Sequence, residues 1–341
     1  MSNFQIRRRD FLWGLAGLSG SVIASQLPIS PASAAIKING AGATFPAPLY
    51  QRWFVEYSKI DKNVQVNYQS VGSGAGVKQF IGATVDFGAS DGAMKDDEIK
   101  QVKNGVVMLP VTAGSVVVAY NNKDVPGLKL TRQQLVDVFL GKIKDWKQLG
   151  ASKSKPIKVI YRSDGSGTTE VFTKHLSAIN PEWKSKVGEG KSVQWPTGIG
   201  AKGNEGVTAT IMQTDGALGY IEYGFAKNNK IPAAQLQNKA GNFVAAGPKT
   251  SSESLSKISL PANLRAFAPD PEGANSYPIV SYTWILAYKK YPKPETAANL
   301  KKVLKWCVSK NGGQALSDDL GYIPLPDNVI AKVNAAIDTI S

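Results

Sequence analysis

Residues 157–179 read IKVIYRSDGSGTTEVFTKHLSAI, an apolar run followed by a turn of small polar residues and a longer segment with helical spacing. The run 157–161 predicts a buried strand, and 168–179 predicts a helix. The same order of strand, short turn and helix recurs along the chain. This order is typical of α/β proteins, so we expect an α/β fold with largely parallel sheets.

The other periodic segments extend this pattern in both directions along the sequence. Apolar alternation and β-branched runs predict strands at 37–39, 64–68, 85–89, 106–110, 115–120, 217–223 and 279–288. Spacings of three and four residues predict helices at 46–59, 77–83, 130–140, 206–213, 295–310 and 328–340. Residues 224–277 are polar and contain proline, which predicts irregular structure.

Length and composition exclude several classes of protein. The 341 residues suffice for two domains, and 43% hydrophobic with 19% charged residues is ordinary for a globular chain, which argues against disorder. The single cysteine excludes an internal disulfide framework and a cysteine metal site, and the single histidine excludes a multi-histidine site. The net charge of +14 favours anionic ligands or partners.

Residues 1–35 resemble an export leader. Arg8-Arg9-Asp10-Phe11-Leu12 is similar to a twin-arginine signal, and Ala32-Ser33-Ala34 is similar to a cleavage site. Glycine and serine interrupt an apolar run too short to span a bilayer, and no cysteine follows it for lipidation. We therefore expect a soluble periplasmic protein without a lipid anchor. Loss of the three arginines and one aspartate of the leader leaves a net charge of +12.

Three turns of small residues stand directly before predicted helices, at 40–45, 72–76 and 164–168. Each offers unpaired backbone N–H groups at the positive end of a helix, together with a hydroxyl, a combination that binds anions. Arg162 precedes the third turn and has a planar fork of donors. Asp91 follows the strand at 85–89. Taken alone, each of these two charged residues also fits a surface position or a cap.

Other chemistries find little support. Ser166 lacks the Gly-x-Ser-x-Gly pattern, and His175, the only histidine, lies inside the predicted helix at 168–179, which argues against a serine hydrolase. There is no P-loop, and Phe45 stands where a dinucleotide fingerprint needs glycine. The aromatic residues fit core positions, not platforms for stacked bases.

Four stretches together resemble the high-affinity phosphate-binding proteins of bacterial phosphate ABC transporters. They are GAGATFPAP (40–48), VGSGAGVKQ (71–79), VDFGASD (85–91) and RSDGSGT (162–168), with further similarity at 135–149, 193–207 and 216–227. The resemblance implies a two-lobe periplasmic binding protein fold (type II) with a hinge. Lobe 1 is then expected at 36–120 and 282–341, and lobe 2 at 121–281.

The resemblance also implies which residues hold the anion. They comprise hydroxyl groups, backbone N–H groups, one guanidinium and one carboxylate. The implied phosphate ligands are Thr44, Phe45, Ser73, Asp91, Arg162, Ser166, Gly167 and Thr168. Asp164 pairs with Arg162 in the family and is expected to orient it. Gly74-Ala75-Gly76 and Ser163 depart from the usual family residues but flank the implied ligands.

This interpretation predicts a non-enzymatic, monomeric binding protein that delivers inorganic phosphate to the permease subunits of an ABC transporter. It needs no cofactor, metal or nucleic acid. Asp91 is expected to select phosphate over sulfate, because a carboxylate accepts a hydrogen bond from a protonated ligand oxygen but repels a fully ionised one. The alternatives are a binding protein for another oxyanion such as sulfate or molybdate, a phosphate sensor or surface adhesion module, and a secreted serine hydrolase using Ser166.

Overall fold

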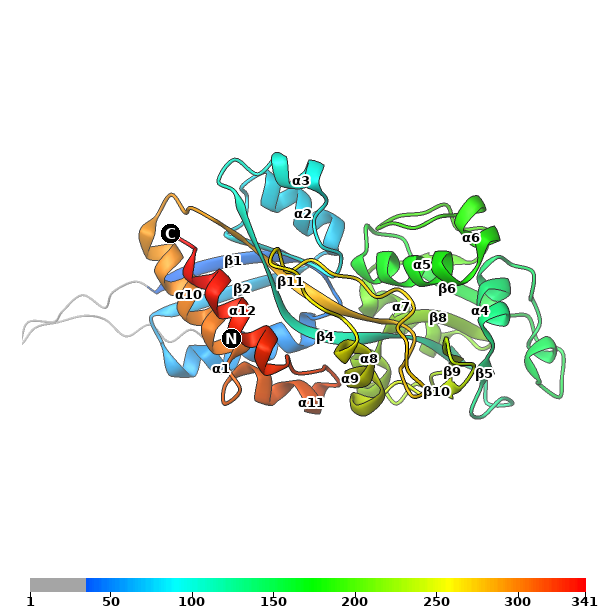
Figure 1. The fold of residues 1–341 in the computed structure, drawn as a ribbon. Coiled ribbons are helices and arrows are strands. Elements are labelled where there is room, and N and C mark those ends of the chain that lie inside the picture. Colours follow the sequence, from blue (N-terminus) through cyan, green and yellow to red (C-terminus); the bar gives the residue numbers. More distant parts are fainter. Residues whose placement is uncertain (1–34) are drawn as a thin grey trace, which may run out of the picture. The chain divides into compact units, whose positions relative to one another are not determined.

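Strand β4 (Val106–Asn121) is the longest strand of the computed structural model, which describes residues 35–341. The predicted leader, apart from Ala35, lies outside the described residues. From Val106 to Ser115 β4 pairs with β11 (Val280–Tyr288), and from Val116 to Asn121 it pairs with β8 (Ala217–Glu222). One strand therefore carries the chain through both halves of the main sheet (Figure 1).

The prediction of two separate strands at 106–110 and 115–120 was wrong, because these residues form one strand. Proline cannot donate a ladder hydrogen bond, so Pro110 is unexpected inside a central strand. In the structure, the pairing with β11 shifts by one residue beside Pro110, at Thr283/Trp284. The bulge accommodates the proline, and the side chain of Gln314 donates to the Val111 carbonyl at 2.9 Å.

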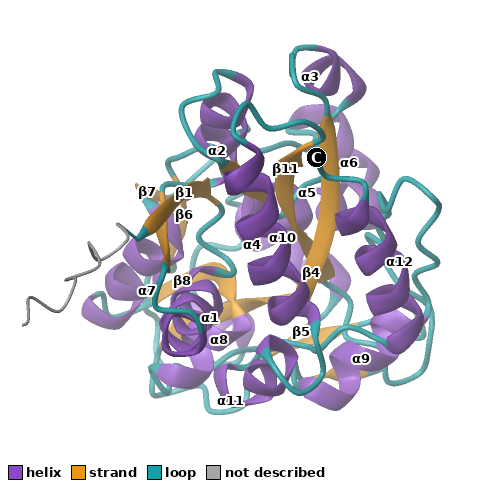
Figure 2. Cartoon of the chain, turned by 90° about the vertical axis from the view of Figure 1, so that its left-hand side faces the viewer, coloured by secondary structure: helices purple, strands orange, loops and turns teal. Residues whose placement is uncertain are grey.

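The main sheet is mixed, so the expectation of largely parallel pairing holds only toward its edges. Its strand order is β2-β1-β3-β11-β4-β8-β6-β7. β1 pairs in parallel with β2 and β3, and β6 with β7 and β8. The central pairs β3/β11, β11/β4 and β4/β8 are antiparallel. β4 and β11 run side by side in opposite directions, since one carries the chain toward β8 and the other brings it back (Figure 2).

The remaining strands are short. In the main sheet they are β1 (Ile36–Gly42), β2 (Val64–Ser70), β3 (Phe87–Ser90), β6 (Lys158–Arg162) and β7 (Ile199–Ala201). A second sheet has the order β10-β9-β5, with β5 (Lys129–Leu130), β9 (Gln235–Gln237) and β10 (Phe243–Val244).

The predicted helices are all present with shifted ends. They are α1 (Ala47–Ile60), α2 (Ser73–Ile81), α4 (Arg132–Phe139), α5 (Gly167–Ile179), α7 (Gly203–Gln213), α10 (Pro294–Val308) and α12 (Asp327–Asp338). The structure also contains helices that the sequence did not predict: α3 (Asp96–Lys100), α6 (Pro181–Lys186), α8 (Tyr223–Asn228), α9 (Pro248–Ser256), α11 (Ser317–Leu320) and the 3₁₀ turns at 146–149 and 313–316. α2 and α7 begin three or four residues earlier than expected, because small residues of the turns themselves form the first helical turn.

The expectation of irregular structure over 224–277 was wrong in part, since this region contains most of α8, both β9 and β10, and α9. These elements are short, and α9 has a mostly polar sequence, PKTSSESLS, which tertiary hydrogen bonds help to hold. The hydroxyl of Ser254 on α9 donates to the carbonyl of Tyr277 at 2.7 Å, and those of Ser251 and Ser115 lie 2.6 Å apart.

Among the described residues, no helix combines the length and apolar character needed to cross a membrane.

Candidate functional site

The first turn, between β1 and α1, carries two buried residues. Thr44 is 2% exposed and Phe45 is fully buried. The Thr44 hydroxyl oxygen accepts hydrogen bonds from the backbone and side-chain N–H groups of Asn204 on α7, at 3.1 and 2.8 Å. The carbonyl of Phe45 accepts from the Tyr322 hydroxyl at 2.8 Å. These bonds hold the turn from both sides.

The second turn places Ser73 beside Asp91. Ser73 opens α2, Asp91 directly follows β3, and both are 1% exposed. The Asp91 backbone N–H donates to the Ser73 hydroxyl oxygen at 3.2 Å, and that hydroxyl lies 3.4 Å from the carboxylate oxygen Oδ2. Thr283 of β11 donates to the other carboxylate oxygen at 2.9 Å. The two strands thus present the carboxylate in one defined orientation.

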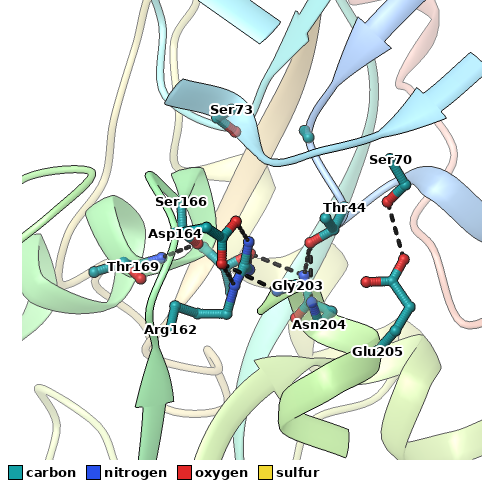
Figure 3. A network of polar contacts seen from close by, with 12 residues as sticks. Thr44, Ser70, Ser73, Arg162, Asp164, Ser166, Thr169, Gly203, Asn204 and Glu205 are labelled. Carbon is teal, nitrogen blue, oxygen red and sulfur yellow. Dashed lines mark hydrogen bonds and ion pairs between the residues drawn. The ribbon is translucent and has the colours of Figure 1, made fainter. Parts of the chain in front are cut away.

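The third turn holds the buried Arg162 through a bidentate ion pair with Asp164. Nε and Nη2 of Arg162, at the end of β6, donate to the two carboxylate oxygens of Asp164 at 2.8 and 2.6 Å. Gly203 at the start of α7 donates its backbone N–H to the same carboxylate at 3.0 Å (Figure 3). Burial works to raise the pKa of Asp164, but the hydrogen bond and charge of Arg162 outweigh it and lower that pKa. Asp164 is therefore a charged anchor for the guanidinium.

Helix α5 directs its N-terminus at the same point. Ser166 is its N-cap and accepts from the Thr169 N–H at 3.0 Å through its hydroxyl, and from the Glu170 N–H at 3.1 Å through its carbonyl. The N–H groups of Gly167 and Thr168 come before these two and have no intrahelical acceptor. They remain available to an anion at the positive end of the helix.

The three turns meet in one place. A Cβ added at Gly167 would stand 2.5 Å from the Ser73 hydroxyl oxygen and 2.7 Å from Oδ2 of Asp91, so α5 lies directly against the second turn. Asn204 connects the first and third turns, since it also donates to the Thr168 hydroxyl oxygen at 3.1 Å. The structure brings together all nine residues implied by the resemblance.

The carboxyl group of Asp91 has a strongly raised pKa. Burial raises its pKa to about 7, against the opposing effects of the hydrogen bond from Thr283, the charge of Arg162 and the hydrogen bond with Ser73. The nearby charge of Glu170 adds to the rise. A carboxyl group that titrates near neutral pH can share a proton with a weakly acidic anion.

Asn204 and Thr283 are the site residues that the sequence did not single out. Asn204 is fully buried and Thr283 is too. One signal was present for Asn204, because Gly203-Asn204 is a fourth small-residue turn before a helix and lies within the similar stretch 193–207. For Thr283, inside an apolar strand, only the pairing of β11 with β3 reveals its place beside Asp91.

The residues that a serine hydrolase or a metal site would need do not form such a site among the described residues. His175 is buried, its Nδ1 lies 2.6 Å from the carbonyl oxygen of Pro269, and burial lowers its pKa to about 4. The Ser166 hydroxyl oxygen accepts the Thr169 N–H as a helix cap, which leaves the hydroxyl hydrogen free to donate. The acidic pairs Asp96-Asp97 and Asp318-Asp319 are exposed. Within residues 35–341 there is no cluster of three or more His, Cys, Asp or Glu residues suited to a metal.

Comparisons with known proteins identify the family of the chain. The profile of the PBP superfamily domain matches residues 30–311. The phosphate-binding protein PstS of Haemophilus influenzae is 41% identical over 317 residues, covering 89% of this chain and 93% of that protein. PstS of Pasteurella multocida is 40% identical over 314 residues, covering 87% and 89%.

Solved structures show the same fold. A high-affinity periplasmic phosphate-binding protein, PfluDING, bound with phosphate, matches with a TM-score of 0.74 at 22% identity, covering 88% of this chain and 93% of that one. A phosphate-binding protein from Stenotrophomonas maltophilia matches with a TM-score of 0.70 at 23% identity, covering 88% and 94%. The two-lobe binding-protein fold expected from the sequence is confirmed.

Proposed function

The chain belongs to the PstS family of phosphate-binding proteins, and we propose that it captures inorganic phosphate at the meeting point of its three turns for an ABC transporter. The observation that carries the proposal is the convergence of Arg162, Asp91 and the N-terminus of α5 with buried hydroxyl groups. The relatives that share this sequence over most of its length are named for binding, not for catalysis. We therefore assign no reaction to the site.

The donor set suits a tetrahedral oxyanion. Arg162 supplies the positive charge, and the hydroxyl groups of Thr44, Ser73, Ser166 and Thr168 with the N–H groups of Phe45, Gly167 and Thr168 replace the water shell. Hydrogen bonds to an ionised group contribute about 1.5–3 kcal/mol each. The set consists of donors apart from Asp91, which matches a ligand whose oxygens mostly accept.

Asp91 is the selective group in this proposal. Phosphate near neutral pH retains at least one proton, which a carboxylate at position 91 accepts. Sulfate has no proton to donate, so its charge faces the carboxylate without a compensating hydrogen bond. A buried polar group left unpaired rejects the wrong ligand by several orders of magnitude. This argues against sulfate or molybdate as the physiological ligand.

The proposal extends to the setting of the protein. Residues 1–35 direct export by the twin-arginine route and are removed, which leaves a soluble, monomeric periplasmic protein without a lipid anchor. Lobe 1 comprises 36–120 and 282–341, lobe 2 comprises 121–281, and closure of the lobes presents a surface to the permease subunits. The pairing of β4 with both β11 and β8 supports a hinge along this strand.

Intrinsic fluorescence tests the ligand. The chain from residue 36 onward contains six tryptophans. Titration of the purified chain with phosphate, arsenate and sulfate, with calorimetry in parallel, is expected to show saturable binding of phosphate and at most weak binding of sulfate. Absence of a response to phosphate in both measurements would reject the proposed function. Tighter binding of sulfate would favour a protein for another oxyanion.

A further inference from the structure

Both the oxygen and the nitrogen of the Asn204 side-chain amide make hydrogen bonds within the protein. Its oxygen accepts the backbone N–H of Glu222 at 2.9 Å, which fixes the orientation of the amide group. Its nitrogen then faces the two threonines and donates to the hydroxyl oxygens of Thr44 at 2.8 Å and Thr168 at 3.1 Å. Each of the two amide hydrogens therefore has its own acceptor, and Asn204 is fully buried at the first turn of α7 (Figure 3).

The two threonine hydroxyl oxygens accept twice each. Thr44 takes its second hydrogen bond from the Asn204 backbone N–H at 3.1 Å, and Thr168 takes its second from Nη1 of Arg162 at 3.4 Å. A hydroxyl group has two acceptor positions and one hydrogen to donate. With both acceptor positions filled, the hydrogen of each hydroxyl must point away from Asn204. Among residues 35–341 neither hydroxyl donates to a protein acceptor.

We propose that Asn204 is a positioning residue that turns the hydroxyl hydrogens of Thr44 and Thr168 toward the bound anion; this inference rests on the proposed function. Without the amide, each hydroxyl regains a free acceptor position and rotates among several orientations. With it, both are committed donors before the ligand arrives, so no rotational freedom is lost on binding. Asn204 thereby acts on the ligand through two other residues from two different turns.

Two other roles for Asn204 predict different measurements. A residue that only joins the first turn to α7 would influence affinity whether or not the threonine hydroxyls are present. A residue that only stabilises the fold would change the free energy of unfolding and not the ligand affinity of the folded chain. The proposed role makes the effect of Asn204 depend on the hydroxyls, which a thermodynamic cycle measures.

The test combines Asn204→Leu, which keeps the approximate volume without donors, with Thr44→Val and Thr168→Val, which keep the shape without hydroxyls. Phosphate affinity is measured by calorimetry on folded protein. Asn204→Leu alone is expected to weaken phosphate binding by about tenfold or more, equivalent to one oriented hydrogen bond to a charged group. In the Thr44→Val/Thr168→Val background the same change is expected to weaken it by less than about twofold.

Ser70→Ala is the matched control. Ser70 donates to Glu205, the neighbour of Asn204, at 2.9 Å and so links β2 to the same turn of α7 without touching either threonine. Its removal is expected to leave phosphate affinity within about twofold of the original. A loss as large as that of Asn204→Leu would show that the link to α7, and not hydroxyl orientation, matters.

The outcomes separate the inference from the proposed function. If the unaltered chain does not bind phosphate, the proposed function fails. If it binds and Asn204→Leu has no effect, or has equal effects with and without the hydroxyls, the role of Asn204 is overturned while the proposed function stands. Where Asn204→Leu does not fold, Asn204→Asp replaces it; its carboxylate draws the hydroxyl hydrogens inward, and binding as tight as in the original chain would equally overturn the inference.

Discussion

The backbone N–H of Gly74 donates a 2.8 Å hydrogen bond to the carbonyl oxygen of Gly165. This bond joins the second and third glycine-rich turns directly, with no side chain between them. A Cβ at Gly74 would lie 3.1 Å from the Cα of Gly165, and the reverse distance is 3.2 Å. The small residues that sequence patterns attribute to anion binding therefore also let two segments 91 positions apart touch through their backbones.

Gly167→Ala is expected to weaken phosphate binding by about a hundredfold or more without lowering stability comparably, because a Cβ there would meet Ser73 at 2.5 Å and Asp91 at 2.7 Å. Calorimetry and thermal unfolding report the two quantities separately. Gly247→Ala is the control, since a Cβ at Gly247 meets nothing within 4 Å. Equal affinity in the two variants would contradict the close approach of α5 to the second turn.

Arg162→Ala is expected to weaken binding of every oxyanion by at least about ten- to a hundredfold, because the site loses the guanidinium that Asp164 orients. Asp164 then keeps a negative charge without its partner, so the double variant with Asp164→Asn separates the two effects. Arg132→Ala serves as control, since Arg132 pairs with Asp270 at 2.8–2.9 Å outside the site. Unchanged affinity in Arg162→Ala would remove the guanidinium from the ligand set.

Asp91→Asn is expected to reduce the preference for phosphate over sulfate by about tenfold or more, because an amide donates a hydrogen bond to an ionised oxygen where a carboxylate repels it. Competition calorimetry with both anions at one pH measures the ratio of affinities. An unchanged ratio would show that selectivity does not depend on Asp91.

The ligand-free stability of the chain should also report on Asp91. Burial raises its pKa to about 7, so between about pH 4 and pH 7 the folded chain holds a proton that the unfolded chain has released. This contribution to stability therefore falls as pH rises through that window, by up to about 4 kcal/mol. Asp91→Asn is expected to gain stability relative to the original chain between pH 4 and pH 8 in urea unfolding. Asp97 is exposed, so Asp97→Asn should show no such gain. If the unfolding free energy of Asp91→Asn changed with pH in the same way as that of the original chain, burial would not raise the pKa of Asp91.

His175 is expected to change the free energy of unfolding with pH in the opposite direction to Asp91. Burial lowers its pKa to about 4, and its Nε2 has no hydrogen-bond partner among the described residues, so protonation adds a buried, unpaired N–H. The unfolded chain binds more protons between about pH 4 and pH 6.5, so this contribution to stability rises with pH there, by about 3 kcal/mol. His175→Asn keeps a donor for Pro269 and should flatten this part of the profile. An unaltered acid-side slope would show that other groups control acid unfolding.

Local features of the fold were predictable from the sequence. The strand before Arg162, the helix after Ser166 and the buried face of α1 depend on apolar spacing and on small residues that start helices, which act over a few neighbouring positions. The weakest predictions fell where tertiary contacts decide. Pro110 lies within β4 beside a bulge in the pairing with β11, and α9 has a mostly polar sequence that gave no helix signal.

The sequence by itself determined the residue types of the site and the free N–H groups at the helix ends, because both are properties of short segments. It did not determine which turns meet. Asn204 reaches Thr44 across 160 positions and Thr283 reaches Asp91 across 192, and both contacts depend on the order in which the strands pair. The tertiary structure alone therefore decided the orientation of the hydroxyl groups and the raised pKa of Asp91, since both arise from burial among residues distant in the chain.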